Sequence, residues 1–173
     1  MRSKYFLYIF IFSLITVSGF SGNNSRDIIL KSAGEIIKSS KYCTLISISE
    51  DGYSNARVMD PFPPDREWVI WMGTNLHSRK VKEILNNSKI SVFYESANGD
   101  GYVTLKGTGT INNEEENKIK YFKKGWKEFY PGDKKNFTLI KFIPKILEIV
   151  SYKNGLLGEK ITWAAPSVIL KNK

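Results

Sequence analysis

A succession of short strand-like segments, separated by turns, constrains the fold of this chain most. In residues 102–111, the apolar residues Val103 and Leu105 alternate with polar neighbours, which is the two-residue period of a β-strand. Residues 68–72 are instead apolar throughout, so both faces of that strand should be covered. The predicted strands are residues 42–49, 55–59, 68–72, 89–94, 102–111, 138–142 and 146–152.

Helical patterns flank and interrupt these strands. The second of them places Ile84 and Leu85 on one side of the helix and Glu83 on the other. The predicted helices run from residue 24 or 25 to about 38, from 77 to 86, and from 113 to about 124. Seven strands with a few peripheral helices predict a mostly β domain, folded as a small antiparallel barrel rather than a sandwich.

The first 21 residues are expected to lie outside this domain. Arg2 and Lys4 precede a nearly uncharged apolar run, and small residues follow it, which is the order of a secretory signal peptide. An uncleaved membrane anchor is the alternative, but residues 5–20 are shorter than the roughly 20 residues that span a bilayer. We therefore expect an exported protein, periplasmic or secreted, with a single mature domain at residues 22–173.

Composition excludes several kinds of chemistry. The chain has one cysteine, Cys43, and one histidine, His77, so it cannot form an intramolecular disulfide, and neither a zinc site nor a catalytic triad is indicated. The formal charge of +9 falls to +7 if Arg2 and Lys4 leave with the leader. Many of the lysines stand near glutamates around residues 114–135, which favours a solvated surface over a nucleic-acid site.

One stretch carries a candidate anion site. Residues 74–80 join an apolar strand to an amphipathic helix, and Ser78, Arg79 and Lys80 lie in its first turn. Basic side chains oppose the helix dipole there, and a bound phosphate would resolve the conflict. A solvated Arg-Lys pair is the alternative. Arg57, inside a predicted strand, must either point outward or meet an anion, and two arginines on one phosphate would suit the guanidinium fork.

These segments resemble the pyridoxamine-phosphate-oxidase-like superfamily. The strand Ala-Arg-Val-Met at 56–59 is followed by an apolar strand and then by Thr-Asn-x-x-Ser-Arg-Lys at 74–80, which is the more specific motif. Residues 126–133 look like the general-stress-protein branch of that superfamily. The resemblance extends over about residues 26–155, with further support at 86–92 and 101–107.

The resemblance implies a split β-barrel of the FMN-binding type, working as a homodimer with flavin mononucleotide (FMN) at the subunit interface. The residues implied to hold the phosphate are Arg57, Ser78, Arg79 and Lys80. Those implied along the flavin ring and ribityl chain are Val58, Met59, Thr74, Tyr102 and Trp126. Trp126 could equally be a core residue. FAD or a deazaflavin is an alternative cofactor, and no metal is implied.

Two departures separate the chain from true pyridoxamine-phosphate oxidases. Phe62 stands where those enzymes carry a lysine, and residues 158–166 lack the arginine of their C-terminal substrate motif. The flavin site is therefore expected without the vitamin B6 substrate site. Three hypotheses stay open: a flavin-dependent oxidoreductase, a non-catalytic flavin carrier or stress-related protein, and a basic module that binds an anionic partner without flavin.

Overall fold

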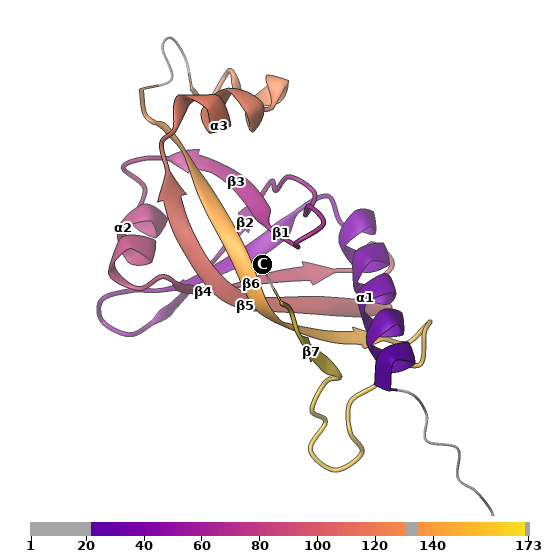
Figure 1. Ribbon diagram of the computed structural model, residues 1–173. Helices are drawn as coiled ribbons and strands as arrows, with labels where there is room; N and C mark the ends of the chain where they lie inside the picture. The colour runs from indigo at the N-terminus through magenta and orange to yellow at the C-terminus, as the bar shows by residue number, and fades with distance from the viewer. Residues whose placement is uncertain (1–21, 131–134, 172–173) are drawn as a thin grey trace, which may run out of the picture.

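The computed structural model describes residues 22–130 and 135–171 of the chain. Within them, seven strands form one antiparallel sheet in the order β2-β1-β4-β5-β6-β3, with β7 beside β6 (Figure 1). The strands are β1 (Cys43–Ile48), β2 (Ser54–Met59), β3 (Ile70–Asn75), β4 (Lys89–Glu95), β5 (Gly101–Asn112), β6 (Phe137–Ser151) and β7 (Ser167–Ile169). The predicted mostly β, antiparallel split-barrel fold is confirmed.

The two ends of the sheet, β2 and β3, meet at one point. Pro61, just beyond β2, bridges Met72 of β3, and the Phe62 N–H donates to the Trp71 carbonyl at 2.8 Å. Elsewhere in the described residues, β2 pairs with β1 alone and β3 with β6 alone. The barrel therefore stays split along most of these two edges, and both keep backbone N–H and C=O groups free for another partner.

β3 separates two hydrophobic clusters. Ile70 and Met72 belong to the main core, which also takes the inward side chains of β1, β4, β5 and β6. Trp71 faces a second cluster with Phe137 and Leu139, and aromatic residues of the segment after β5 pack on it. The prediction that both faces of this strand are covered is thus confirmed. Its predicted start is wrong, because Trp68 has a φ of 66° and the strand begins at Ile70.

One long strand replaces two predicted ones. β6 runs without interruption through Pro144, where the sequence suggested a break. The register against β5 shifts between Lys106 and Gly107, and Gly107 pairs with Pro144. A Cβ on Gly107 would lie 2.2 Å from the Ile143 carbonyl oxygen, so the glycine lets the two backbones approach closely at this bulge. The short β7 strand was not predicted.

The helices lie around the sheet (Figure 1). α1 (Gly22–Ser39) contacts β4, β5, β6 and β7, and α2 (Arg79–Asn86) contacts β1 and β5. α3 (Glu115–Lys120) and the 3-10 turn η1 (Lys124–Trp126) follow β5. None of the helices in residues 22–130 or 135–171 is long and apolar enough to cross a membrane. The predicted signal peptide, residues 1–21, lies outside the described residues.

Three details of α2 and its approach differ from the sequence prediction. Glu83 is buried, with 4% of its surface exposed, whereas Leu85 is 69% exposed. The predicted facing of these two residues is therefore wrong, because Glu83 gains ion-pair partners inside the fold. α2 also starts two residues later than predicted, at Arg79, with Ser78 at the N-cap, and Thr74 lies inside β3.

The bulge opposite Pro144 generates a stability prediction. Gly107→Ala places a methyl group against backbone that cannot move without breaking the β5–β6 pairing, so it should lower the free energy of unfolding by about 1–3 kcal/mol. Gly125→Ala is the matched control, since nothing lies within 4 Å of a Cβ there. Urea unfolding of both variants tests this, and equal stabilities would contradict the role given to Gly107.

Candidate functional site

A cleft of about 370 Å³ lies at the split between β2 and β3. The ends of the two strands form its walls, with Val58 and Met59 on one side and Gly73 and Thr74 on the other. α2 contributes Lys80, and the segment after α3 contributes Trp126, Phe129 and Tyr130. The cleft is open because the two edge strands do not pair here. Backbone groups and side chains of both strands are therefore accessible to a ligand at the same place.

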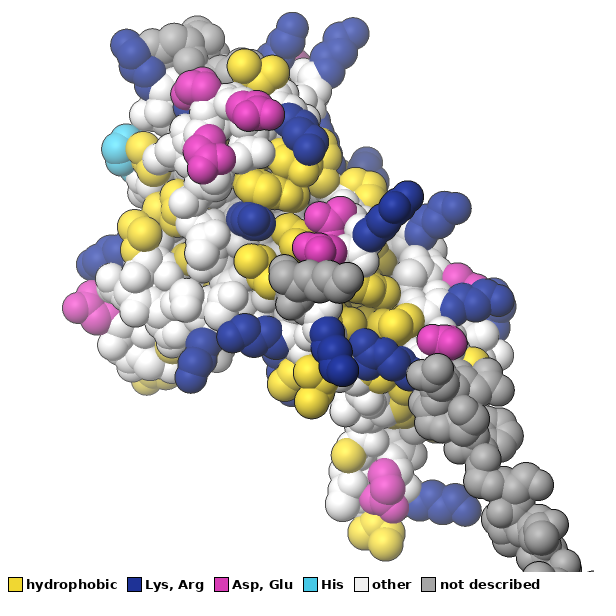
Figure 2. Space-filling view, in the orientation of Figure 1, with side chains coloured by type: hydrophobic (Ala, Val, Ile, Leu, Met, Phe, Trp, Pro, Cys, Tyr) yellow, Lys and Arg dark blue, Asp and Glu magenta, His cyan; other side chains and the backbone are white. Residues whose placement is uncertain are grey.

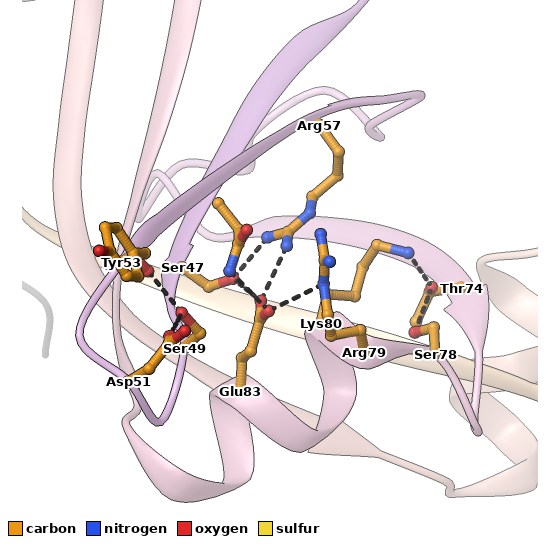
Figure 3. Close-up of polar contacts among 11 residues, drawn as sticks. Ser47, Ser49, Asp51, Tyr53, Arg57, Thr74, Ser78, Arg79, Lys80 and Glu83 are labelled. Carbon is orange, nitrogen blue, oxygen red and sulfur yellow. Dashed lines mark hydrogen bonds and ion pairs between the residues drawn. The ribbon is translucent and has the colours of Figure 1, made fainter.

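The first polar cluster lies at the α2 side of this cleft. Lys80 Nζ donates to Thr74 Oγ1 at 3.1 Å, and Thr74 Oγ1 lies 3.3 Å from Ser78 Oγ (Figure 3). Thr74 is 4% exposed, so its hydroxyl is held in place by the strand and the helix start together. The structure thus unites three of the predicted phosphate and ribityl residues in one group.

The second cluster is centred on Glu83, which receives both predicted arginines (Figure 3). Arg57 Nη2 lies 2.8 Å from Glu83 Oε2, and Arg79 Nε lies 3.2 Å from Glu83 Oε1. Asn55 Nδ2 donates to Oε1 at 2.9 Å, and Ser47 Oγ donates to Oε2 while accepting from Arg57. Arg57 and Arg79 therefore converge as predicted, but the group they share in this structure is a carboxylate of the chain itself.

The charges of the two clusters do not cancel. Arg57, Arg79 and Lys80 carry three positive charges against the one negative charge of Glu83, which leaves +2. Burial lowers the pKa of Lys80, and the nearby charges of Arg57 and Arg79 lower it further, while Glu83 raises it. An anion bound among these cations would relieve their repulsion.

Trp126 forms the floor of the cleft. Its ring lies so close to Gly73 that a Cβ on this glycine would be 2.3 Å from Trp126 Cζ3. Trp126 Nε1 donates to Asp60 Oδ2 at 3.0 Å, and Asp60 also forms an ion pair with Lys123. Trp126 is in addition one of the aromatic residues that pack on the second hydrophobic cluster, as its interpretation as a core residue expected, while its contact with a flavin stays a prediction.

Four of the predicted site residues do not line the cleft itself: Arg57, Ser78 and Arg79 lie in the clusters beside it, and Tyr102 lies elsewhere. Tyr102 stands on the outer face of the sheet, with its ring 5.5 Å from that of Phe93, and it does not line the cleft. Val58 is 69% exposed and borders both the cleft and the shallow depression beside Phe93. The outer face around Phe93 therefore adjoins the cleft through Val58.

Eight cleft or cluster residues were not among the predicted site residues: Ser47, Asn55, Asp60, Gly73, Asn75, Glu83, Phe129 and Tyr130. Asp60 directly follows a predicted strand that contains Arg57, and this position only weakly indicates that Asp60 belongs to a site. Glu83 stands four residues after Arg79, a spacing that brings two side chains of a helix together. Nothing in the local sequence indicates that Trp126 would pack on Gly73, since more than fifty residues separate them.

The fold and the cleft define a split-barrel protein with a cleft between its two edge strands and a cluster of cations beside it. The family model described as "Pyridoxamine 5'-phosphate oxidase like" matches residues 30–159, three quarters of the chain. The chain belongs to this family. Curated proteins gave no match.

Solved structures share the fold. A protein related to general stress protein 26, from Clostridium acetobutylicum, is similar with a TM-score of 0.64 and 23% identity over 73% of this chain and 89% of that one. General stress protein 26 from Bacillus anthracis has a TM-score of 0.60 and 20% identity, over 73% of this chain and 94% of that one. A protein named F420 reductase has a TM-score of 0.53 and 16% identity, over 65% of this chain and 92% of that one.

The buried carboxylate of Glu83 generates a pH prediction. Burial raises its pKa, but hydrogen bonds from Ser47 and Arg57 and the charges of both arginines outweigh this, so the pKa lies below its ordinary value of 4.5. A depressed pKa stabilises the fold above the ordinary value, and the contribution is lost as the pH falls through the lowered pKa. Glu83→Gln should cost about 1.5–3 kcal/mol of unfolding free energy at pH 7, and less as the pH falls below 4.5.

The matched control for this prediction is Glu50→Gln. Glu50 pairs with Lys82 at 3.4 Å, and both side chains are more than 70% exposed, so its loss should change stability by less than about 0.5 kcal/mol. Chemical denaturation of both variants across pH 3–8 provides the measurement. A Glu83→Gln deficit that does not depend on pH would contradict the ion-pair account.

Proposed function

We propose that the cleft between β2 and β3 binds FMN and that the protein is an FMN-dependent oxidoreductase. The observation that carries this proposal is the net charge of +2 in the two clusters beside the cleft. A phosphomonoester carries about −1.5 to −2 at neutral pH, so it matches this excess. Lys80, Ser78 and Thr74 provide one amine and two hydroxyls for the oxygens of the phosphate. Arg57 and Arg79 supply the remaining positive charge.

The rest of the cleft suits a flat, polar-edged ring. The free edge of β2 at Val58 and Met59 presents backbone donors and acceptors along the rim of such a ring. Trp126, fixed by its bond to Asp60, offers an aromatic surface, as Phe129 and Tyr130 do beside it. When bound there, FMN would supply the electron-transfer chemistry, and the chain would supply its binding, orientation and shielding from water.

The proposal excludes pyridoxamine phosphate as the substrate. Phe62 occupies the place of the substrate-binding lysine of true oxidases, and its ring packs edge-on against Tyr121 at 5.2 Å and Trp126 at 5.8 Å. A side chain so placed supports the aromatic floor and offers no charge to a second phosphate. The C-terminal segment 158–166 likewise contains no arginine.

Catalytic turnover distinguishes the proposed oxidoreductase from a protein that only carries flavin. Bound FMN should be reduced by NADH or NADPH in an oxidoreductase and should not be in a carrier. The similarity to a protein named F420 reductase makes a deazaflavin the second cofactor to test. We further propose that residues 1–21 direct export, so that flavin binding takes place outside the cytoplasm.

Titration with FMN and with riboflavin, which lacks the phosphate, tests the site. FMN should bind much more tightly, and Arg79→Ala or Lys80→Ala should weaken FMN about 10- to 1,000-fold, corresponding to about 1.4–4 kcal/mol of binding free energy. Both variants should leave riboflavin affinity unchanged. Lys82→Ala on the same helix is the matched control and should change neither, since Lys82 pairs with Glu50 on the surface. Equal affinity of the wild-type protein for the two ligands would refute the phosphate site.

We also propose that the protein is a homodimer that uses the outer face of the sheet around Phe93. Trp71 and Tyr94 are buried inside one chain, so they offer no surface to a partner. Phe93, Tyr102 and the 69% exposed Val58 do share that face, which adjoins the cleft. A second copy there would place the flavin at the interface, and the partner subunit's Tyr102 would approach it from the far side.

Light scattering tests the dimer. The wild-type protein should have twice the mass of one chain, and Phe93→Glu should halve it at micromolar concentration by burying charge in the interface. Ile161→Glu is the control, because Ile161 is 87% exposed in the C-terminal loop, away from this face. A wild-type monomer that still binds FMN would overturn both the dimer and the interface site.

A further inference from the structure

A second, larger pocket lies on the other side of the segment that follows β2. It measures about 750 Å³ and is bounded by the C-terminal half of α1 and by the loop of residues 60–68. Only Asp60 lines both this pocket and the flavin cleft. The proposed flavin binding assigns nothing to it, and the family resemblance bears on one lining residue, Phe62, which stands where true pyridoxamine-phosphate oxidases carry a lysine. Its volume lies in the range of pockets that bind small organic molecules.

Aromatic and proline side chains form much of its wall. Phe62, Trp68, Pro61, Pro63 and Pro64 all come from the loop between β2 and β3. Figure 2 shows hydrophobic side chains on the face between α1 and α3, with basic and acidic ones around them. A wall of rings favours a flat, apolar ligand.

Gly34 keeps the helix side of the pocket open. It stands within α1 and lines the pocket, and a Cβ placed there would meet no atom within 4 Å. Glycine inside a helix is unfavourable relative to almost any other residue. No packing in the described chain requires it here, so the space beside Gly34 is room that a ligand can occupy.

The charges around the opening favour an anion. Lys123 is neutralised by Asp60, and Asp65 accepts backbone N–H groups of its own loop. Lys38, Lys41 and Arg66 also line the pocket, and none of the three forms an ion pair within residues 22–130 or 135–171.

We propose that this pocket binds an aromatic carboxylate. The ring lies against Phe62 and Trp68 in the space beside Gly34, and the unpaired cations at the opening attract its charge. The site is separate from the flavin cleft and does not depend on the proposed FMN binding.

Calorimetric titration of the full chain with 2-naphthoate, and with the neutral 2-naphthalenemethanol, tests this proposal. Naphthoate should bind at least tenfold more tightly than the alcohol, and Arg66→Gln should reduce only the naphthoate affinity, about three- to tenfold. Gly34→Leu should fill the pocket and abolish binding without lowering the melting temperature. Lys31→Leu, an exposed position of the same helix outside the pocket, should leave binding intact.

Three results would overturn the proposal. These are equal affinity for the acid and the alcohol, naphthoate binding that survives Gly34→Leu, and displacement of naphthoate by FMN, which would place the probe in the flavin cleft. FMN affinity should be the same in Gly34→Leu as in the wild type. Failure of FMN binding in every variant would therefore refute the flavin proposal and leave the second pocket standing.

Discussion

The unclosed seam between β2 and β3 is the constraint on which the rest of this structure depends. The two edge strands meet at Pro61 and Met72 and are otherwise unpaired with each other in the described residues. Free strand edges are a liability for a folded protein, and covering them is a general requirement. Here α2 and the aromatic segment after α3 flank the seam, and the cleft lies between them. The proposed flavin would fill what the sheet leaves open.

Glu83 explains how three cations can stay together beside this cleft before any ligand arrives. Its carboxylate joins two arginines from different elements and is satisfied by Ser47 and Asn55 as well. Like charges at this distance would otherwise repel one another; burial lowers the pKa of Lys80, and the charges of Arg57 and Arg79 lower it further. One carboxylate lowers the cost of assembling the three cations and leaves an excess of positive charge. In the proposed complex, phosphate binding and folding would therefore be linked through the same group.

The loop between β2 and β3 separates two pockets of different character. On one side, polar clusters and a free strand edge suit a phosphorylated, polar-edged ring. On the other, prolines and rings suit an apolar acid. Asp60 belongs to both, since it fixes Trp126 and Lys123 from its position just after β2. A ligand in one pocket thus shares a wall residue with the other, which gives a physical route by which occupancy of one could affect the other.

The sequence alone determined the strand content, the antiparallel barrel class and the Thr74–Lys80 motif, because two-residue alternation and local residue order report directly on strands and helix starts. It predicted that Arg57 and Arg79 share one anion, and the structure brings them together on the Glu83 carboxylate. It could not show that Glu83 is buried, that β6 passes through Pro144, or that Tyr102 lies on the outer face. Each of these depends on contacts between segments distant in the chain, such as Glu83 with Arg57 and Gly107 with Pro144. Only the tertiary structure decides these, because the environment that favours a buried charge or a strand proline is supplied by other parts of the fold.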